Sequence, residues 1–364
     1  MSSKYNVLIL GASYGSLLAS KLLLAGHAVT MVCTPSTAGL INKKGTLVKL
    51  PVRGRDELVE IESKQVEAAN PGATISAAKP QDVQPGEFDL VVLGMQEPQY
   101  SSPGVCDLLQ RVAEAKVPSM AIMNMPPLPY LRRFEGLDVE PLMECYAEPS
   151  LWKNFDPDLV TLASPDPQAF RPEDAGKNVL QVSLPTNFKV AAFPDPAHTA
   201  MLTQMQNDIE SISWELPEGG ATALPVKLKV FDSLFVPLAK WSMLVTGNYR
   251  CILRNDIRSI KDAVHGDLEE SREVYQWVIS LCETMGADAG DLVPFDKYAN
   301  AASGLVKPSS GARALFGGAR NIERVDALVK NIAAQHGLQH DSLDNTVAFV
   351  DAHLALNRQE KKAS

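Results

Sequence analysis

The stretch that most constrains the fold of this chain is residues 5–34. A short apolar run from Val7 to Leu10 fits a buried strand, and the sequence Gly-Ala-Ser-Tyr-Gly-Ser follows it at once. Leucines at helical spacing then continue to Gly26, and a second apolar run begins at Ala28. A strand, a glycine turn, a helix and a strand within about thirty residues are typical of the opening of a dinucleotide-binding fold.

The glycine turn predicts a site for a pyrophosphate. Backbone N–H groups at a helix N-terminus bind anions, and side chains in the turn would block the approach. Gly11 makes the turn and Gly15 lets helix and strand approach closely, while Ser13 replaces the middle glycine of the usual fingerprint. An ordinary turn of another parallel α/β protein is the alternative. The residues expected to bind the cofactor here are Gly11, Ala12, Ser13, Tyr14 and Gly15.

The end of the second strand predicts which nicotinamide cofactor is bound. An Asp or Glu at this place suits the ribose of NAD, and its absence admits the 2′-phosphate of NADP. Here Thr34 is followed by Pro, Ser and Thr without a carboxylate, and Lys43 and Lys44 come soon after. The pattern favours NADP, with NAD as the alternative, and adds Thr34 to the cofactor residues. A solvated loop would explain the same hydroxyls and lysines.

The composition limits the class of protein. The chain has 364 residues, enough for two domains, and its 45% apolar and 21% charged residues are typical of a globular protein. A net charge of −9 without a long basic run argues against nucleic acid as a partner. The longest apolar stretch, residues 230–245, contains Asp232 and Lys240, so we expect no membrane span. Five cysteines without a CxxC pair and the lack of a leader suit the cytoplasm, and scattered histidines predict no metal site.

Two strands after the opening motif are expected to carry further cofactor residues. Residues 88–94 and 119–123 are apolar runs that fit buried strands. Ligands of doubly wound sheets lie outside the carboxyl ends of strands, so Gln96 and Asn124 are expected at the cofactor. Asn124 could instead be a turn residue that bonds its own backbone. Weaker strand signals lie at residues 45–50, 73–77, 159–162, 179–182 and 188–192, and helices are expected at residues 105–115 and 198–212.

The second half of the chain changes in character. The sequence from Pro217 to Gly220 is predicted to be a linker, and helical patterns follow it without a strand signal. We therefore predict a Rossmann-type doubly wound parallel sheet over residues 1–216 and an all-helical domain over residues 221–364. Such a plan closes a cleft in which a small substrate meets nicotinamide. The expected long helices cover residues 227–246, 262–285, 320–336 and 343–356.

With these features the chain resembles the ketopantoate reductase family. The helical domain of that family carries a lysine followed eight residues later by an asparagine, and Lys240 and Asn248 fit this pattern on one helix face. The resemblance implies that Lys240 is the general acid that protonates the carbonyl of a small 2-keto acid. Its apolar neighbours should lower the pKa of its amine. Lys227 is a rival for this role, and a lysine that extends along a helix surface is the structural alternative.

Other positions follow the family less closely. Ser309 matches the serine that binds the substrate carboxylate, whereas Asn321 takes the place of the family's glutamate, with Glu323 two residues on. Leu244 replaces an intermediate asparagine, and Gln96 stands near the place of a missing lysine. These departures imply another 2-keto acid, or an imine, as the substrate. The substrate residues expected from the resemblance and from charge are Asn248, Ser309, Asn321 and Arg313.

Three functions are open at this point. The first is an NADPH-dependent reductase with Lys240 as the proton donor. The second is an opine-type dehydrogenase that reduces an imine of an amino acid and a keto acid, for which His265 and Asp267 could supply a His–Asp pair. The third is a nucleotide-binding relative without catalysis, which the replacements at Ser13, Leu244 and Asn321 would suit. A homodimer through the helical domain is also left open.

Overall fold

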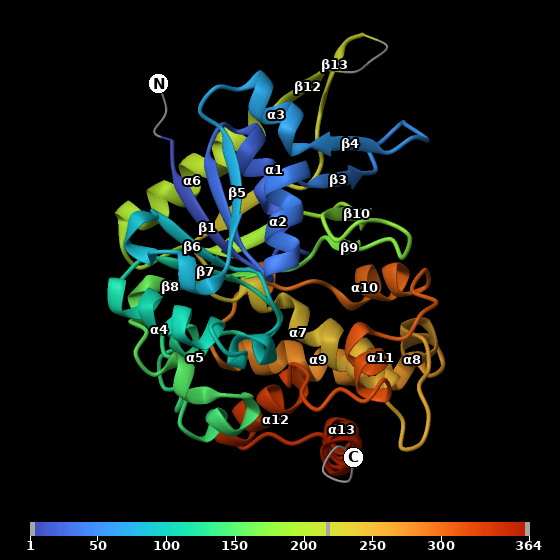
Figure 1. Cartoon of the computed structure of the whole chain (residues 1–364). Coiled ribbons are helices and arrows are strands. Elements are labelled where there is room, and N and C mark those ends of the chain that lie inside the picture. Colours follow the sequence, from blue (N-terminus) through green and yellow to red (C-terminus); the bar gives the residue numbers. More distant parts are fainter. Residues whose placement is uncertain (1–3, 216–218, 361–364) are drawn as a thin grey trace. The chain divides into compact units, whose positions relative to one another are not determined.

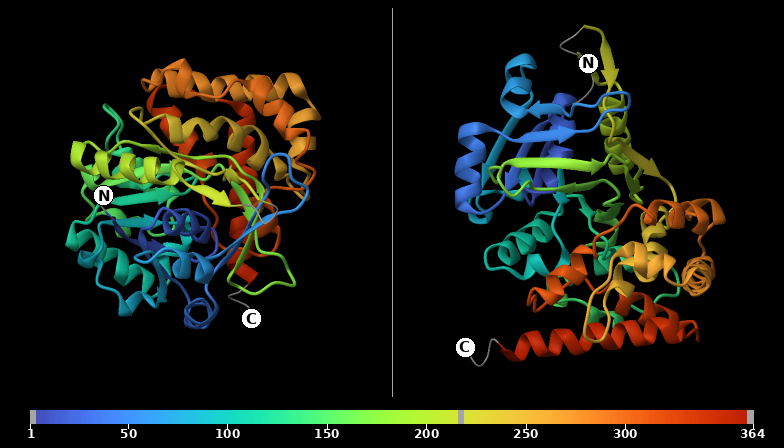
Figure 2. Two further views of the ribbon diagram at one scale, coloured as in Figure 1. Left: turned by 90° about the horizontal axis from the view of Figure 1, so that it is seen from above. Right: turned by 90° about the vertical axis from the view of Figure 1, so that its right-hand side faces the viewer.

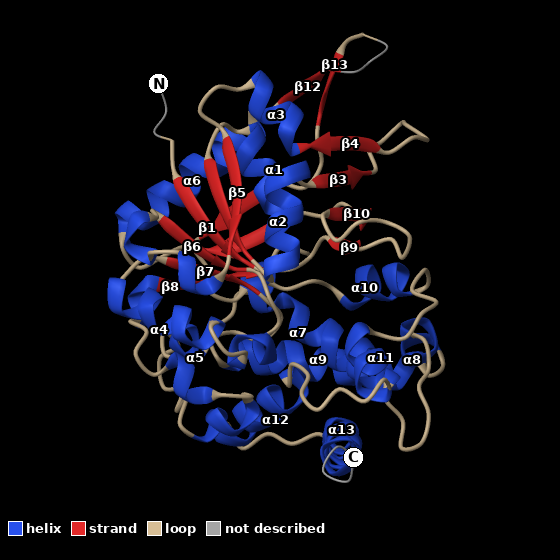
Figure 3. Cartoon of the chain, in the orientation of Figure 1, coloured by secondary structure: helices blue, strands red, loops and turns tan. Residues whose placement is uncertain are grey.

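The chain, seen in a computed structural model, forms two compact units. The structure describes residues 4–215 and 219–360. The first unit comprises Met1–Met95, Gln99–Tyr130 and Leu151–Asp232, and the second comprises Gln96–Pro98, Leu131–Ser150 and Ser233–Ser364. Strands gather in the first unit and helices make up most of the second (Figures 1 and 3).

An eight-stranded mixed sheet forms the centre of the first unit. Its strands are β1 (Asn6–Leu10), β2 (Ala28–Val32), β5 (Thr74–Ala78), β6 (Leu90–Leu93), β7 (Ser119–Ile122), β8 (Val160–Ser164), β11 (Phe188–Ala191) and β14 (Leu228–Phe231). The order is β14-β11-β8-β7-β6-β1-β2-β5, and every neighbouring pair is parallel except β8 with β11. The chain runs from β1 to β2 and β5 and then returns to β6 on the other side of β1. This makes the carboxyl ends of β1 and β6 the switch point at which ligands of such sheets bind.

The helix after β1 is buried on nearly all sides. The helices of this unit are α1 (Gly15–Leu24), α2 (Pro35–Lys44), α3 (Ser63–Ala69), α4 (Val105–Ala115), α5 (Leu128–Leu131) and α6 (Pro196–Glu210). Every residue of α1 except Leu24 is buried, because α1 contacts the central sheet as well as α3, α6 and strand β3 (Leu47–Leu50). The leucines that predict this helix therefore lie in a segment that packs against several neighbouring elements at once.

A second sheet and a hairpin were not predicted. Strands β4 (Val59–Glu62), β3, β10 (Val179–Leu184) and β9 (Gln168–Phe170) form a four-stranded sheet in that order. The parallel pairing of β3 with β10 joins segments far apart in sequence, which no local pattern can indicate. Strands β12 (Ser213–Glu215) and β13 (Ala221–Ala223) pair as a hairpin that extends from the body of the unit (Figures 1 and 2).

The second unit is helical over most of its described length. Its helices are α7 (Lys240–Met243), α8 (Ile260–His265), α9 (Leu268–Thr284), α10 (Phe295–Ala302), α11 (Ser310–Phe316), α12 (Val325–Gln335) and α13 (Asp341–Glu360). The last of them is one uninterrupted helix (Figure 2). Val274, Tyr275 and Val278 of α9 are buried at helical spacing, as the amphipathic pattern predicts. Within residues 4–215 and 219–360, no helix is both long and apolar enough to cross a lipid bilayer.

Three of the predicted helices are wrong in their extent. The helix predicted over residues 320–336 begins only at Val325. The first part of the helix predicted over residues 227–246 is strand β14, because lysines alternate there with apolar residues at the strand period of two. Proline is disfavoured inside an α-helix, and Pro237 instead lies in the first turn of a 3₁₀ segment, Val236–Ala239, that precedes α7. The helix predicted over residues 262–285 is two helices, α8 and α9, because the Asp267 carboxylate caps the start of α9.

The division into units differs from the predicted domains, residues 1–216 and 221–364. The boundary lies at Asp232, because β13 and β14 belong to the first unit. The second unit also includes Leu131–Ser150, in which the 3₁₀ turn Pro141–Cys145 packs against α12.

The described residues of the predicted linker, Gly219 and Gly220, directly precede strand β13. Gly219 and Gly220 have φ angles of +94° and +86°, which suit a turn and favour glycine. Pro217 and Glu218 of the same predicted linker lie outside the described residues. Glycine-rich sequence indicates a turn but does not distinguish a hairpin from a domain boundary.

Lys21 is an ionisable side chain in the fully packed helix α1. It is 1% exposed. Burial, with a smaller contribution from the positive charge of Lys227, lowers the pKa of its amine from 10.5 to about 7. The folded state therefore binds this proton less tightly than the unfolded chain does.

Replacing Lys21 with Met should raise the free energy of unfolding at pH 7. The unfolded chain binds more protons between pH 7 and pH 10.5, so this lysine makes wild-type stability rise with pH by up to about 1.4 kcal/mol per unit. Urea unfolding of both proteins from pH 7 to pH 9.5 measures the difference. Lys153→Met, at an exposed lysine, is the matched control. It should change neither the free energy of unfolding at pH 7 nor the slope of that free energy with pH. An unchanged pH slope in Lys21→Met would contradict the burial argument.

Candidate functional site

The turn between β1 and α1 leaves no room for side chains at its two glycines. Gly11 has a φ of +106°, and a Cβ there would lie 2.6 Å from Met95 Cγ and 2.9 Å from the Gly94 carbonyl oxygen. A Cβ at Gly15 would lie 2.6 Å from Ile9 Cγ2. Glycine is therefore required at both positions for the helix to approach the sheet edge.

The amides of this turn are available to a ligand. The Ser16 amide and hydroxyl both donate to the Ser13 carbonyl, at 3.2 and 2.7 Å. In contrast, no hydrogen bond within the described part of the chain uses the amides of Ala12, Ser13, Tyr14 or Gly15. Four adjacent N–H groups at a helix N-terminus attract an anion. The turn therefore fits the pyrophosphate of a dinucleotide.

The side chain of Tyr14 is engaged elsewhere. Its ring meets Phe188 of β11 edge-on, with 5.9 Å between centroids, and its hydroxyl donates to the Pro167 carbonyl at 2.7 Å. Burial raises the pKa of the Tyr14 hydroxyl well above its usual value. Tyr14 can therefore offer the candidate site its amide but not its phenol.

The end of β2 presents hydroxyl groups but not the predicted lysines. Thr34 is exposed at the start of α2, with its Oγ1 3.0 Å from Thr37 Oγ1 and 3.4 Å from Ser36 Oγ. Lys43 and Lys44 lie in the last turn of α2. A ten-residue helix is about 15 Å long, so these lysines are carried away from Thr34. Their place at the far end of α2 therefore adds nothing to the preference for NADP.

A basic residue from another part of the sequence acts electrostatically on the end of β2. Burial raises the pKa of the Cys33 thiol to about 11, and the positive charge of Arg171 opposes that shift. Arg171 is exposed and directly follows β9 of the second sheet. No sequence pattern connects Arg171 to the end of β2, because the two segments are far apart in the chain.

The remaining predicted cofactor residues lie beyond neighbouring strands. Asn124 is partly buried and follows β7 by two residues. Gln96 is exposed, follows β6 by three residues and belongs to the second unit. Among the described residues, no group of three or more His, Cys, Asp or Glu side chains is placed to hold a metal ion.

Lys240 begins a helix that changes its winding twice. The α-helical segment α7 is followed by a π-helical turn, Leu244–Asn248, and a 3₁₀ turn, Tyr249–Cys251. The Tyr249 amide donates to the Leu244 carbonyl, which is the i→i+5 bond of a π-helix. Single π-helical turns inside helices are frequent at functional sites. Lys240 is partly buried, next to the buried Trp241.

The π-helical turn affects how Lys240 and Asn248 face each other. Each residue of an α-helix advances about 100° around the axis, so eight residues overshoot two turns by about 80°. A π-helix has more residues per turn, and the five residues of this turn reduce the overshoot. The winding therefore favours the predicted common face of the two side chains.

The other predicted substrate residues of the second unit have structural contacts. Ser309 is buried, donates to the Asn248 carbonyl at 2.8 Å and caps α11 by accepting an amide hydrogen bond. Asn321 is exposed and accepts a hydrogen bond from Arg358 of α13 at 3.0 Å. Arg313 is exposed on α11. The structure thus joins Ser309 to Asn248 and gives Asn321 a different partner.

The rival residues are placed differently from what the alternatives require. Lys227 precedes strand β14 in the first unit, and its amide donates to Asn187 Oδ1 at 2.8 Å, so it lies on no helix. His265 Nε2 lies 2.9 Å from the Ala299 carbonyl. The Asp267 carboxylate instead accepts the Glu270 amide at 2.9 Å. His265 and Asp267 therefore do not form the pair that the opine-type alternative needs.

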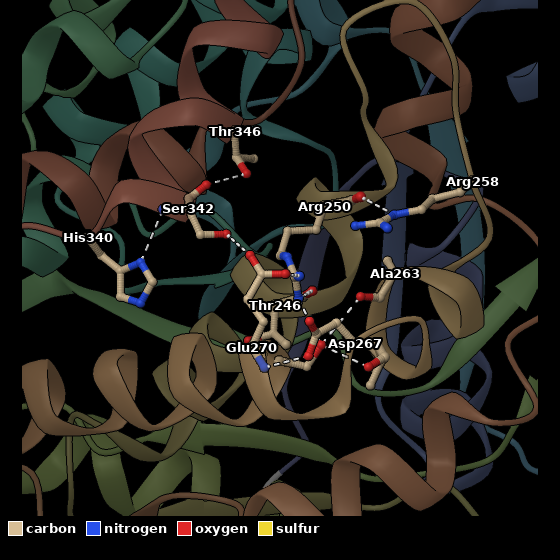
Figure 4. A network of polar contacts seen from close by, with 11 residues as sticks. Thr246, Arg250, Arg258, Ala263, Asp267, Glu270, His340, Ser342 and Thr346 are labelled. Carbon is tan, nitrogen blue, oxygen red and sulfur yellow. Dashed lines mark hydrogen bonds and ion pairs between the residues drawn. The ribbon is translucent and has the colours of Figure 1, made fainter.

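A polar network holds the end of the Lys240 helix (Figure 4). Arg250 is buried and donates to Ser271 Oγ at 2.8 Å, to the Glu270 carboxylate, and to the Thr246 carbonyl at 3.5 Å. Burial lowers the pKa of Arg250, and the charge of Glu270 opposes this. Ser342 Oγ donates to Glu270 at 3.0 Å. Helices α9 and α13 are thereby tied to the π-helical turn.

A buried pair of glutamates was missed from the sequence. Glu97 is 1% exposed, both of its carboxylate oxygens lie 3.2 Å from the Ala147 amide, and its own amide lies 3.4 Å from Glu323 Oε1. Burial raises the pKa of Glu97 to about 7, opposed by the Ala147 hydrogen bond and assisted by the charge of Glu323. The sequence offered one indication of this site, because Glu97 directly follows Gln96 near the end of a predicted strand.

The Glu97 carboxyl should make stability depend on pH. Because its folded-state pKa lies above the unfolded value of 4.5, its stabilising proton is lost as the pH rises through about 7. Glu97→Gln removes this loss, so its stability relative to wild type should be greater at pH 8 than at pH 5 in urea unfolding. The control Glu114→Gln, at an exposed glutamate, should show no such change. If the stability of Glu97→Gln relative to wild type were the same at pH 5 and at pH 8, the raised pKa of Glu97 would be contradicted.

Comparison with solved structures identifies the fold. No protein-family model matches the chain, and no curated protein matches it by sequence. A ketopantoate reductase from Ralstonia eutropha is similar with a TM-score of 0.56 and 15% identity, over 97% of this chain and 99% of that one. A dimeric ketopantoate reductase from Staphylococcus aureus has a TM-score of 0.60 and 11% identity over the same shares. D-mandelate dehydrogenase, solved with NADH and anilino(oxo)acetate, has a TM-score of 0.60 and 12% identity, again over 97% and 99%.

These similarities confirm the predicted fold class and the predicted resemblance to ketopantoate reductases. The first unit is Rossmann-like, although its sheet is mixed rather than wholly parallel, and a helical region follows it. The chain has the fold of the ketopantoate reductases.

Proposed function

We propose that this chain is an NAD(P)H-dependent reductase that converts the carbonyl of a small 2-keto acid into a hydroxyl. The observation that carries the proposal is the turn after β1, where four amides without intramolecular partners in the described structure lie between glycines that exclude side chains. These amides would hold the pyrophosphate. The bound nicotinamide supplies the hydride. The fold shared with ketopantoate reductases, and with a dehydrogenase solved with NADH, supports the same reaction class.

Lys240 is the proposed proton donor. An ammonium group next to the substrate carbonyl stabilises the negative charge that develops on oxygen as the carbon is reduced, and it delivers the proton there. Asn248 would position the substrate through its side-chain amide. Ser309 would act mainly through Asn248, because its hydroxyl proton is donated to the Asn248 carbonyl.

The end of β2 supports NADP over NAD. No carboxylate follows the strand, and the hydroxyls of Thr34 and Ser36 are exposed at the start of α2. A 2′-phosphate there would meet hydrogen-bond donors at a helix N-terminus. Arg171 would add a charge that can bind a phosphate through two parallel hydrogen bonds.

Lys240→Ala should lower kcat about 100-fold or more and leave the Kd for NADPH unchanged, because it removes a proton donor but no cofactor contact. NADPH oxidation against a panel of 2-keto acids, with and without an amine, measures the first quantity. Lys227→Ala, at the rival lysine, is the matched control and should retain its turnover. Wild-type turnover in Lys240→Ala would contradict the role of Lys240. A wild-type chain that oxidises NADPH with none of the acids would contradict the proposed reaction.

Arg171→Ala should weaken NADPH binding about tenfold or more and leave NADH binding unchanged. The charged hydrogen bonds that it removes would contact only the 2′-phosphate, and such bonds are worth about 1.5–3 kcal/mol. Titration of both cofactors into wild type, Arg171→Ala and the exposed control Arg53→Ala measures this. Equal affinities of Arg171→Ala and wild type for NADPH would contradict the role of Arg171.

A further inference from the structure

The π-helical turn after α7 receives a hydrogen bond from a neighbouring helix. In a regular α-helix the Met243 carbonyl would accept the Gly247 amide. Here the hydroxyl of Tyr298, from α10, donates to the Met243 carbonyl at 3.0 Å. A carbonyl at the start of the π-helical turn thus has a side-chain partner, which helps to stabilise a winding that is rare in proteins.

Gly247 provides the space for this contact. A Cβ at Gly247 would lie 1.9 Å from the Tyr298 hydroxyl oxygen, 3.3 Å from its Cζ and 3.1 Å from Ile260 Cγ2. Real Cβ atoms do not approach another atom to 1.9 Å. The hydroxyl of Tyr298 therefore occupies the position that any other residue at 247 would fill.

The ring of Tyr298 is itself held in place. It is 6% exposed and stacks on the ring of Tyr275 in α9, with 5.4 Å between centroids and 19° between planes. Phe295 packs edge-on against Tyr275 at 5.3 Å. Two helices therefore fix the position from which the Tyr298 hydroxyl reaches the turn.

Side chains also hold the carbonyls at the far end of the turn. Arg250 lies 3.5 Å from the Thr246 carbonyl, Cys251 Sγ lies 3.3 Å from the Gly247 carbonyl, and Ser309 donates to the Asn248 carbonyl. The last carbonyls of a helix lack intrahelical partners, so these contacts are expected at an end. The contact of Tyr298 differs because it lies inside the helix, between Lys240 and Asn248.

We infer that Tyr298 is a positioning residue, which sets the angle between Lys240 and Asn248 by holding the turn between them in its π-helical form. The inference rests on the proposed function, in which these two side chains serve one substrate. Relaxation of the turn to α-helix would move Asn248 around the axis toward the 80° or so of offset expected for eight α-helical residues. Small displacements of this kind can cost catalysis about 100-fold.

Tyr298→Phe tests the inference because it removes the hydroxyl and keeps the ring. The variant should lower kcat about tenfold or more, with the Kd for NADPH unchanged. Thr161→Val is the matched control, since it also removes a buried hydroxyl that donates to a carbonyl, that of Ala191 at 2.6 Å, in the first unit. It should lose similar thermal stability but keep its kcat. Equal kcat values of the two variants would overturn the inference.

A crystal structure of Tyr298→Phe tests the same point without relying on turnover. The Tyr249 amide should transfer from the Leu244 carbonyl to the Val245 carbonyl, which is the α-helical bond. Retention of the bond to Leu244 would overturn the inference. Absence of turnover in the wild-type chain would count against the proposed reaction alone, so the two failures can be told apart.

A double variant tests the contact between Gly247 and Tyr298. Gly247→Ala should lower the melting temperature strongly, because its Cβ and the hydroxyl cannot share one position. Adding Tyr298→Phe removes the oxygen and leaves Cζ at 3.3 Å, so the double variant should be more stable than Gly247→Ala alone. A double variant that is less stable than Gly247→Ala would overturn the proposed contact.

Discussion

The close approach of α1 to the edge of the central sheet is the constraint on which the first unit depends. It requires glycine at positions 11 and 15, because Met95, the Gly94 carbonyl and Ile9 occupy the space that a Cβ would need. The same approach buries almost all of α1, and the amides at its start make no hydrogen bond within the described residues. Burial of Lys21 within this helix is an energetic cost of that packing.

The helix that carries Lys240 in the second unit depends on side-chain partners for its shape. Tyr298, Arg250 and Ser309 each bond a carbonyl of the segment between Met243 and Asn248. These partners come from α10, from the helix itself and from the cap of α11. These contacts can hold the α-helical, π-helical and 3₁₀ parts of the segment in one conformation. A site that depends on the angle between Lys240 and Asn248 requires such a fixed conformation.

Local pattern was enough to predict the opening motif and several helices. The bounds of α4, Val105–Ala115, are those expected from apolar spacing, and Gly11 and Gly15 have the roles that their place implies. The sequence did not indicate the second sheet or the position of Arg171, because both depend on pairing between distant strands. The burial of Glu97, and the partner of Asn321 on α13, likewise depend on tertiary contacts. Strand β14 was missed for another reason, since the alternation of lysine and apolar residues from Lys227 to Val230 was available and was interpreted as helix.

The central claim is that the amides at the start of α1 hold a dinucleotide. The most direct test is a backbone amide NMR titration of the labelled chain with NADPH and with NADH. We predict saturable shifts of the amide signals of Ala12, Ser13, Tyr14 and Gly15, because these N–H groups would exchange water for pyrophosphate oxygens. Binding of either cofactor that leaves these four signals unchanged, or no binding of either, would contradict the account.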